Sequence, residues 1–427
     1  MTFRSLVKAI IPRGIFAKIE PWGHLAEAVL FNVINGFPAR GLKIIGVTGT
    51  DGKTTTCFSI HKVLSQAGYK VGLMTTVSYG LGEDLKPQQR HMTTMPAPVL
   101  LKQIKQLKKA GAQWLVLETT SHALAQHRVW GIPYSIAVLT NISHEHLDYH
   151  GSFDRYLAAK KKLFSQTAAN KKGLRTGVIN ADDASAGLFK TITPVTLTYG
   201  IKTGDLKARD IKLTASGSDY NAEISDTKYA IACHLPGRFN IYNSLAAVAV
   251  GRIVGLSPKQ IERGIATLAI VPGRMESIDE GQDFKAYVDY AVTPSALESV
   301  LKTLKDITAG RLILVFGATG DRDKSKRPMM GEIAAKNADA IFLTDDETYT
   351  EDPAAIRQAV RQGIEAAGGA KKTTEIADRR QAIKAAMKAA SKDDLVLITG
   401  IGHQSTRNMG GREEAWDEVS IVRELLK

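Results

Sequence analysis

The sequence predicts an α/β protein, and three observations predict it. From Leu42 onward, short apolar runs alternate with amphipathic helical segments, which is typical of parallel sheets. A glycine-rich loop separates the first apolar run from the first helix, and a second alternating series begins after Pro272. We therefore expect a central phosphate-loop domain with a mostly parallel sheet and a small antiparallel excursion, followed by a Rossmann-like α/β domain.

The hydrophobic pattern places the elements of the central domain. Strands are expected at residues 42–47, 71–76, 114–118 and 135–140. Helices are expected after the glycine-rich loop up to Gly68, through residues 100–107 and 153–164, and at residues 240–254 and 257–268. Alternating, turn-rich sequence between residues 195 and 234 predicts the antiparallel excursion.

The second series predicts an open sheet of its own. Its strands are expected at residues 285–289, 311–316, 340–344, 374–376 and 395–399, with helices such as 295–304 and 355–366 between them. This divides the chain into a short N-terminal helical segment (1–45), a central domain (46–271) and a C-terminal domain (272–427).

Composition excludes several classes of protein. The 427 residues are 44% hydrophobic and 23% charged, which excludes disordered, collagen-like and coiled-coil chains. No apolar run approaches the roughly 18 to 20 residues that span a bilayer. The net charge of +13 favours anionic partners such as nucleotides, phosphates or an acidic membrane surface. Cys57 and Cys233 lie beside apolar residues without metal-like spacing, which predicts packed thiols in a reducing, cytoplasmic compartment.

The first eleven residues have an amphipathic helical pattern. The apolar stripe consists of Phe3, Leu6, Val7, Ile10 and Ile11, and Pro12 ends it. The charges that interrupt the run exclude a cleavable signal peptide. Two interpretations stay open: a helix docked on its own domain, or a segment held near anionic lipid headgroups by Arg4, Lys8, Arg13 and Lys18.

The strongest chemical signal is the loop Gly46-Val-Thr-Gly-Thr-Asp-Gly-Lys-Thr-Thr-Thr56. Backbone N–H groups of such a turn wrap phosphate oxygens, Lys53 can reach the terminal phosphates, and the Thr54 hydroxyl can ligate Mg²⁺. Val47 stands where a strict Walker A loop has glycine, so the loop is a variant. The sequence predicts an ATP site formed by Gly49, Thr50, Asp51, Gly52, Lys53, Thr54 and Thr55.

Candidate metal ligands follow neighbouring strands. Glu118 ends a buried strand, which brings a carboxylate to the phosphate edge of the sheet. The loop at residues 141–150 follows another strand and contains His144, Glu145, His146, Asp148 and His150. This density predicts at least one histidine ligand beside the nucleotide.

Several motifs resemble those of the Mur ligases in order and spacing. They are Thr-Gly-Thr-Asp-Gly-Lys-Thr-Thr at 48–55, Glu-Thr-Thr-Ser-His at 118–122, Gln-His-Arg at 126–128, Thr-Asn-Ile-Ser-His-Glu-His-Leu-Asp-Tyr-His-Gly at 140–151 and Tyr-Leu-Ala-Ala-Lys at 156–160. Gly-Asp-Arg-Asp-Lys-Ser-Lys-Arg-Pro at 320–328 and Glu-Asp-Pro at 351–353 narrow the resemblance to the MurE branch, the UDP-N-acetylmuramoyl-dipeptide:amino-acid ligases. The resemblance runs from about Gly46 to the end of the chain, and the fold it implies agrees with the predicted elements.

The resemblance implies an ATP-dependent amide-bond ligase of peptidoglycan precursor synthesis. ATP would convert a muramoyl-peptide carboxylate into an acyl phosphate, which the amino group of an amino acid attacks. Lys53, Glu118, His146 and Lys160 are the implied catalytic residues. Thr54 and Glu118 would hold one Mg²⁺, and His146 with a carbamylated Lys160 a second. Further ATP contacts are implied at Asn240, Asn243, Arg274 and Asp289, and no nucleic-acid partner is expected.

The resemblance also assigns substrate contacts. They are Thr93, Thr94, Thr120, Gln126, Arg128, Arg322, Asp346, Glu347, Tyr349, Gly400 and Gln404. The family's Asp-Asn-Pro-Arg reads Asp-Glu-Thr-Tyr at 346–349, and its Gly-Lys-Gly-His-Glu reads Gly-Ile-Gly-His-Gln at 400–404. The arginine and the acid that select diaminopimelate are thereby replaced, so we do not expect diaminopimelate. For lysine, Glu347 could supply the carboxylate that Gln404 lacks, and the amino acid stays open.

The sequence also leaves open which muropeptide accepts the amino acid. About 45 residues precede the phosphate loop, which is too short for the UDP-gripping domain of this branch, so a UDP-linked and a lipid-linked muropeptide are both considered. A folylpolyglutamate-type ligase and a nucleotide-dependent binding protein are considered beside them. The metal-ligand set Glu118, His146 and Lys160 favours an enzyme over a binding protein.

Overall fold

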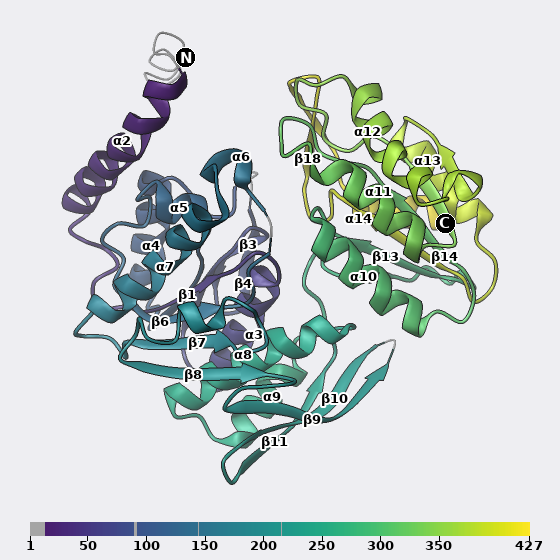
Figure 1. Cartoon of the computed structure of the whole chain (residues 1–427). Coiled ribbons are helices and arrows are strands. Elements are labelled where there is room, and N and C mark those ends of the chain that lie inside the picture. Colours follow the sequence, from purple (N-terminus) through teal and green to yellow (C-terminus); the bar gives the residue numbers. More distant parts are fainter. Residues whose placement is uncertain (1–12, 89–91, 144, 215) are drawn as a thin grey trace.

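The computed structural model describes residues 13–88, 92–143, 145–214 and 216–427. The stripe expected in residues 1–11 and the candidate ligand His144 lie outside these ranges. Figure 1 shows two bodies, a larger one in purple to teal and a smaller one in green to yellow. Each body is built around its own sheet, as the alternating patterns predict.

The larger sheet is mostly parallel and has antiparallel strands at both ends. Its order is β11-β10-β9-β8-β7-β6-β1-β5-β2-β3-β4, and β1 pairs in parallel with both β5 and β6. Its strands are β1 (Lys43–Thr48), β2 (Val71–Met74), β3 (Ser78–Leu81), β4 (Asp84–Pro87), β5 (Trp114–Glu118), β6 (Tyr134–Leu139), β7 (Thr176–Asn180), β8 (Val195–Gly200), β9 (Leu206–Thr214), β10 (Gly217–Ile224) and β11 (Thr227–Cys233). The antiparallel excursion expected between residues 195 and 234 is β9 to β11, whereas β8, at the start of that range, pairs in parallel with β7 and β9.

Helices cover both faces of this sheet. They are α2 (Arg13–Ile34), α3 (Lys53–Gln66), α4 (Ala97–Lys109), α5 (Ser121–Ala125), α6 (Leu147–His150), α7 (Phe153–Ala169), α8 (Arg238–Val254) and α9 (Pro258–Ala266). One apolar core joins α3, α8 and α9 to one face, and another joins α4 and α7 to the opposite face. Because alternate strand residues enter alternate cores, these strands are apolar throughout. Cys57 and Cys233 are buried free thiols, as expected.

The smaller body has a six-stranded sheet in the order β12-β13-β17-β14-β15-β16. Its strands are β12 (Glu276–Ile278), β13 (Lys285–Asp289), β14 (Leu312–Phe316), β15 (Ala340–Leu343), β16 (Thr373–Glu375) and β17 (Leu395–Thr399). The helices are α10 (Pro294–Ile307), α11 (Lys326–Asn337), α12 (Pro353–Ala366), α13 (Arg379–Ala389) and α14 (Glu418–Leu426). A separate hairpin, β18 (Thr406–Met409) and β19 (Arg412–Ala415), lies beside it.

The long helix α2 lies in the N-terminal segment (1–45) that was expected to be helical, but its bounds were not predicted. Pro21 and Gly23 lie inside it, and both residues ordinarily interrupt a helical pattern. The C-terminal part of the helix is anchored to the larger body, because Asn32 is buried and its Nδ2 atom donates to the carbonyl of Trp130 at 3.0 Å. Figure 1 shows α2 along the outer edge of the larger body. Among the described helices, none is both long and apolar enough to cross a membrane.

The sheet topology brings the candidate site residues together at one edge of the larger sheet. β5, β1 and β6 are neighbours and run in the same direction, so the loops that follow them meet at one edge of the sheet. The carboxyl end of β13 faces this edge from the smaller body, because Asp289 and Glu118 line one cavity. The candidate site therefore lies between the two sheets.

Candidate active site

The phosphate loop between β1 and α3 needs glycine at two positions. Gly49 has φ 153° and Gly52 has φ 77°. A Cβ atom on Gly49 would lie 1.8 Å from Thr140 Oγ1, and one on Gly52 would lie 2.4 Å from Asn243 Oδ1. The loop thus passes so close to its neighbours that a side chain is excluded. The first amides of α3 lack partners within the helix, which makes this end an anion-binding position.

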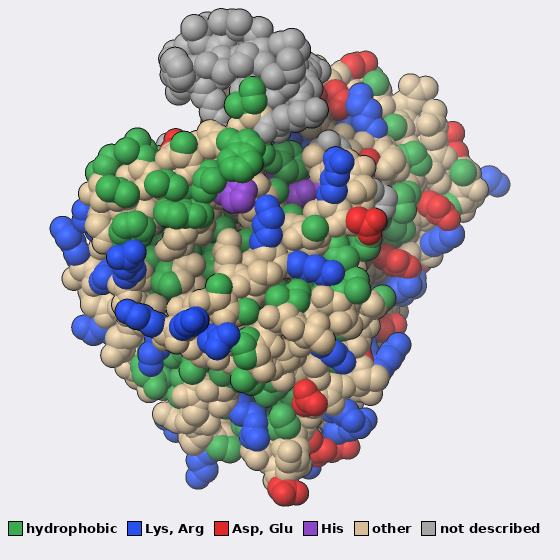
Figure 2. Space-filling model, turned by 60° about the vertical axis from the view of Figure 1, so that its left-hand side comes forward, with side chains coloured by type: hydrophobic (Ala, Val, Ile, Leu, Met, Phe, Trp, Pro, Cys, Tyr) green, Lys and Arg blue, Asp and Glu red, His purple; other side chains and the backbone are tan. Residues whose placement is uncertain are grey.

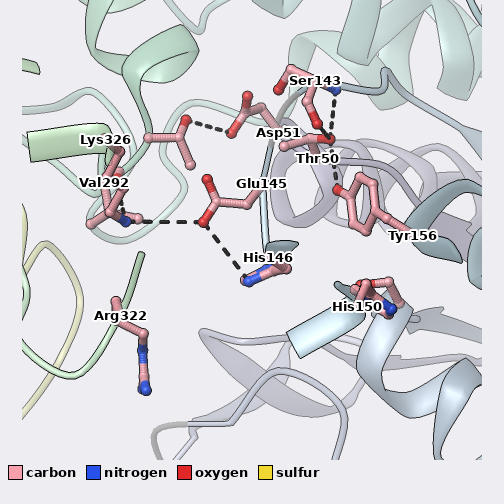
Figure 3. Close-up of polar contacts among 12 residues, drawn as sticks. Thr50, Asp51, Ser143, Glu145, His146, His150, Tyr156, Val292, Arg322 and Lys326 are labelled. Atoms are coloured by element: carbon pink, nitrogen blue, oxygen red, sulfur yellow. Dashed lines mark hydrogen bonds and ion pairs between the residues drawn. The ribbon is translucent and has the colours of Figure 1, made fainter. Parts of the chain in front are cut away.

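The same loop is held from outside. The Thr50 amide donates to the Asn141 carbonyl at 2.8 Å, and the Asp51 amide donates to Asn141 Oδ1 at 2.9 Å. Thr50 Oγ1 and Tyr156 OH are hydrogen-bonded at 2.8 Å, and the Ser143 amide donates to Thr50 Oγ1 at 2.9 Å (Figure 3). These hydrogen bonds fix the conformation of the loop.

Glu118 and Thr54 come together as the sequence predicts. Glu118 is 1% exposed, and its Oε2 atom accepts hydrogen bonds from Thr54 Oγ1 at 2.9 Å and Thr76 Oγ1 at 3.1 Å. The Thr76 amide donates to the same oxygen at 3.0 Å. Lys53 Nζ donates to the Thr50 carbonyl at 2.6 Å. A carboxylate with two hydroxyls is the hard-oxygen donor set that Mg²⁺ prefers, so these residues fit the metal.

Lys160 is buried against the loop. Its side chain is 1% exposed, its Nζ atom donates to the Gly49 carbonyl at 2.5 Å, and it lies 4.4 Å from the centroid of the Tyr156 ring. Burial, with a smaller effect of Lys53, lowers the pKa of Lys160 well below its ordinary value. A neutral amine is a nucleophile, so the environment suits a chemical modification of this lysine.

His146 follows β6 and lies between the two bodies (Figure 3). Burial and the neighbouring His122 lower the pKa of His146 from 6.5 to about 2, so the ring is neutral and keeps a lone pair for a metal. Among the described residues, no group of three or more His, Cys, Asp or Glu side chains forms a metal cluster.

Residues of the smaller body reach the phosphate loop. Arg274 Nη2 lies 3.5 Å from Thr54 Oγ1, and the guanidinium lies 4.6 Å from the Tyr290 ring centroid. Asp51 accepts hydrogen bonds from Ser295 Oγ at 2.7 Å and Thr293 Oγ1 at 3.2 Å. The phosphate loop thus contacts both bodies, and we expect nucleotide binding to be linked to how the two bodies meet.

Two adjoining cavities contain most of the expected residues. The larger, of about 590 Å³, is lined by Lys53, Glu118, Asn240, Arg274 and Asp289, among others. The smaller, of about 160 Å³, is lined on the C-terminal side by Arg322, Glu347, Tyr349, Gly400 and Gln404. Both cavities share the wall formed by Thr76, Thr93, Glu145, His146, Tyr290 and Val292. A group in one cavity is therefore close to a group in the other.

The asparagines expected at the nucleotide form a buried pair. Asn243 Nδ2 donates to Asn240 Oδ1 at 2.8 Å, and Thr56 Oγ1 donates to Asn243 Oδ1 at 3.1 Å. Asn240 Nδ2 donates to the Pro236 carbonyl at 2.8 Å. The pair joins α8 to α3 and forms part of the wall of the larger cavity.

The smaller cavity has an acidic and a basic end. Arg322 Nη2 donates to Tyr349 OH at 3.4 Å, and its guanidinium lies 4.9 Å from that ring centroid. Glu347 Oε2 accepts from Gln404 Nε2 at 3.3 Å and from Tyr349 OH at 3.5 Å. The Asn408 amide donates to Glu347 Oε1 at 3.1 Å, so β18 holds this carboxylate in place.

Some expected residues lie behind the cavities. Arg128 Nη1 donates to the Thr94 carbonyl, and Thr94 Oγ1 donates to the Glu118 carbonyl at 2.9 Å. Asp346 Oδ1 accepts from the Glu347 amide at 2.7 Å. Gln126 is the half-buried residue that ends α5. Neither cavity's lining includes Thr94, Gln126, Arg128, Asp346 or Lys160, whereas Thr120 lines the larger one.

Lys326 and Tyr290 are among the lining residues that were not assigned to the site from the sequence. Lys326 Nζ donates to the Val292 carbonyl at 2.9 Å and lies 3.9 Å from Glu145 Oε1, which lies 3.8 Å from His146 Nδ1 (Figure 3). Tyr290 lines both cavities. Lys326 lies inside the motif at 320–328, which is the signal that could have identified it.

A phosphate loop, an oxygen-rich cation site and a joined second cavity define an ATP-dependent acid–amino-acid ligase. Residues 47–251 match the Mur ligase middle domain, and residues 273–402 match the glutamate ligase domain of the Mur ligases. The chain belongs to the Mur ligase family.

Its relatives include MurE proteins. The UDP-N-acetylmuramoyl-L-alanyl-D-glutamate--2,6-diaminopimelate ligase of Caldanaerobacter subterraneus subsp. tengcongensis is 38% identical over 94% of this chain and 82% of that protein. Ligase 1 of that name from Clostridium acetobutylicum is 36% identical over 98% and 84%. A solved structure of a ligase with this name has a TM-score of 0.63 at 33% identity, covering 96% of this chain and 82% of that one. Mycobacterium tuberculosis folylpolyglutamate synthase has a TM-score of 0.71 at 16% identity, covering 88% and 92%, a likeness of fold alone.

The contact between Asp51 and Ser295 predicts a measurable role in closure. A typical hydrogen bond that is not fully buried contributes about 0.5–1.5 kcal/mol, so we expect Ser295→Ala to raise the KM for ATP about 2- to 10-fold with little change in kcat. Steady-state kinetics against ATP would measure this. The control is Ser420→Ala, at an exposed serine of α14. Equal KM values in parent and variant would contradict the proposed coupling.

The buried carboxyl of Asp289 is expected to make the free energy of unfolding depend on pH. Burial raises the pKa of its carboxyl from 3.8 to about 6, and Arg274 offsets part of this. Because the folded pKa exceeds the unfolded one, stability falls as pH rises from about 4 to 6, by up to ~3 kcal/mol. We expect Asp289→Asn to reduce this slope and to raise the free energy of unfolding at pH 8, while the similar contribution of the buried Asp346 remains. Denaturant unfolding at pH 4 and pH 8 would measure it, and an unchanged slope would contradict it. The exposed Asp279→Asn serves as the control.

Proposed function

We propose that the chain joins an amino acid to the carboxylate of a UDP-linked muramoyl-dipeptide, in the cytoplasm, as a step of peptidoglycan precursor synthesis. The observation that carries this is the wall shared by the two cavities, at Thr93, His146 and Tyr290. A carboxylate at this wall can meet the γ-phosphate from one side and an amine from the other. Relatives named as diaminopimelate ligases support the acceptor class.

The chemistry has two steps. A carboxylate oxygen attacks the γ-phosphorus of ATP, the bond to ADP breaks, and an acyl phosphate forms. The amine then attacks the acyl carbon, the carbon–oxygen bond to phosphate breaks, and the amide forms with loss of a proton. Lys53, Arg274 and the first amides of α3 would bind and orient the phosphates, and the shared lining of the larger cavity by Lys53 and Arg274 supports this.

We propose two Mg²⁺ ions, one held by Thr54 and Glu118 and one by His146 with a carbamate on Lys160. When bound, the ions would reduce the repulsion between ATP and the carboxylate. The carbamate forms when the neutral Lys160 amine attacks CO₂ and loses a proton, which turns a cation into an anionic oxygen ligand. Burial supports this, since it lowers the pKa of the lysine.

We propose that the amino acid has a basic side chain and a single carboxylate, as lysine and ornithine do. Arg322 is placed for the α-carboxylate, and the buried Glu347 offers the opposite end of the cavity to a cation. A second carboxylate, as in diaminopimelate, would approach Glu347 and be repelled. The relatives' names point to diaminopimelate, so diaminopimelate must be compared directly with lysine and ornithine.

Replacing Glu347 tests this selection. We expect Glu347→Gln to raise the KM for the basic amino acid about 10- to 100-fold, because a buried hydrogen bond between charges contributes ~1.5–3 kcal/mol. The KM for ATP should stay the same. Glu375→Gln, in β16 and paired with Arg357, is the control. An unchanged KM for the amino acid would exclude Glu347 from its recognition.

The test of the function is phosphate release from ATP and Mg²⁺ with UDP-N-acetylmuramoyl-dipeptide, across a panel of amino acids with bicarbonate present. We expect release with lysine or ornithine and a ligated product by mass spectrometry. If no amino acid of the panel gave phosphate release while ATP still bound, the UDP-linked acceptor would be rejected. Lipid-linked muropeptide and folate substrates would then be assayed in the same way, and silence with all of them would favour a binding protein.

We also propose that the N-terminal segment contacts anionic lipid. Arg4, Lys8, Arg13 and Lys18 accompany an apolar stripe in the sequence, although residues 1–12 lie outside the described part of the chain. Such a segment would hold the enzyme near a membrane surface. Sedimentation with anionic vesicles, with and without residues 1–12, tests it, and equal binding would reject it.

A further inference from the structure

Helix α2 exposes an apolar stripe. Ile19, Trp22, Leu30 and Val33 are 51%, 70%, 55% and 60% exposed, and Ala26 between them is also exposed. Their spacing of three or four residues places them on one face of the helix. An exposed, unbroken apolar row of this length is unusual on a monomeric protein, whereas a single exposed apolar residue is not.

The opposite face of α2 is already in use. His24, Ala28 and Asn32 are buried, and α2 packs on α4. Asn32 Nδ2 bonds to the carbonyls of Ala28 and Trp130. The helix is therefore fixed to the larger body with its stripe facing outward, and it cannot turn the stripe inward without losing these contacts.

Basic side chains adjoin the stripe. Helix α4 carries Lys102, Lys105, Lys108 and Lys109 and has no acidic residue. Lys105 Nζ donates to Asn35 Oδ1 at 3.3 Å, just beyond the end of α2, and Lys108 Nζ donates to the Arg40 carbonyl at 2.5 Å. Figure 2 shows this side of the molecule, with hydrophobic side chains gathered below the undescribed residues and Lys and Arg side chains around them.

We propose that α2 lies in the headgroup region of an anionic membrane, with Trp22, Leu30 and Val33 in contact with lipid and the lysines of α4 facing the lipid phosphates. An apolar stripe beside a cationic rim has the charge and polarity of such a surface. Tryptophan is also the side chain most favoured at this depth. The proposal rests on the membrane contact proposed above. It assigns the main apolar contact with lipid to α2 instead of residues 1–12. It is independent of the ligase chemistry.

Vesicle binding tests the stripe. The full chain is mixed with vesicles of phosphatidylglycerol and phosphatidylcholine, or of phosphatidylcholine alone, and bound protein is measured by sedimentation. We expect binding to the anionic vesicles, and a loss of at least about 10-fold in the partition coefficient for the double variant Trp22→Glu/Val33→Glu. The matched control is Leu188→Glu/Val195→Glu, which changes two similarly exposed apolar residues, 50% and 56% exposed, elsewhere on the larger body. It should bind like the parent.

The rim is tested by charge reversal. We expect Lys102→Glu/Lys109→Glu to weaken binding to anionic vesicles and to reduce the salt dependence of that binding. The control is Lys388→Glu/Lys392→Glu, at exposed lysines of the smaller body, which should leave both quantities almost unchanged. In the parent, Trp22 fluorescence should shift to shorter wavelength on binding, and the shift should be absent in Trp22→Phe. Thermal unfolding and phosphate release in solution should be unchanged in all variants, which separates lost binding from misfolding and from failure of the ligase function.

Three results would overturn the proposal. One is equal vesicle binding by the stripe variant and its control. Another is binding that is lost on removal of residues 1–12 but kept by Trp22→Glu/Val33→Glu, which would return the contact to the first residues. The third is that the parent protein does not bind vesicles but forms a dimer, and that Trp22→Glu/Val33→Glu dissociates this dimer. That result would assign the stripe to contact with a second copy of the chain.

Discussion

Lys160→Ala is expected to lower kcat for ligation about 10²- to 10³-fold, the range seen when one preorganised electrostatic group is removed. The side chain is buried against the Gly49 carbonyl, so its loss removes the proposed carbamate from the edge of the phosphate loop. Phosphate release with saturating substrates would measure the loss. Acetate or propionate at millimolar concentration should restore part of the activity, because either can supply an oxygen ligand in the space left by the carbamate.

The neighbouring lysine provides the control for this prediction. Lys161→Ala changes an adjacent, more exposed residue of α7 and should keep nearly full activity without any carboxylate effect. A carbamate signal in the ¹³C spectrum of the parent with labelled bicarbonate should be missing from Lys160→Ala. Full activity of Lys160→Arg, which cannot form a carbamate, would exclude the proposed modification.

Glu118→Gln is expected to have an effect of similar size by a different route. The substitution keeps the shape and allows Thr54 and Thr76 to donate to the amide oxygen, so the protein should fold normally. It removes the negative charge of the proposed metal site, and we expect kcat to fall about 10²-fold or more. The Mg²⁺ concentration for half-maximal activity should rise as well.

A titration of phosphate release against Mg²⁺ at saturating ATP separates these effects. The control is Glu83→Gln, at an exposed glutamate paired with Lys62. If the variant needed no more Mg²⁺ than the parent, Glu118 would not be a metal ligand. Retained binding of ATP in the absence of Mg²⁺ would show that the phosphate loop itself is intact.

Local signals in the sequence were sufficient for the repeating elements. β5 matches its expected bounds because four apolar residues are followed by the charged Glu118, and α8 lies within two residues of expectation because Gly255 ends it with φ 87°. The hairpin β18–β19 was not predicted, although Gly410 and Gly411, both at positive φ, join its strands. Its strands are short and polar, so neither apolar alternation nor length reveals them.

The site divides in the same way. The order of residues along the chain predicts Thr54 next to Glu118, because loops after neighbouring parallel strands share an edge. It does not predict which groups of the smaller body reach that edge, since Asp51 and Ser295 are 244 residues apart. Nor does it separate the residues that line the cavities from those that support them: Thr93 and Thr94 are adjacent, yet Thr93 lines both cavities and Thr94 lies behind them.

By itself, the sequence determined the α/β class, the family, the phosphate loop and the residue types that carry the chemistry, because these depend on local periodicity and on short spacings. Only the tertiary structure decided which of those residues meet. It joined the two cavities at Thr93 and His146, buried Lys160 beneath the loop, and left the stripe of α2 exposed. The physical reason is that burial, pKa and contact depend on how distant segments pack, and an apolar stripe has the same pattern whether the core covers it or not.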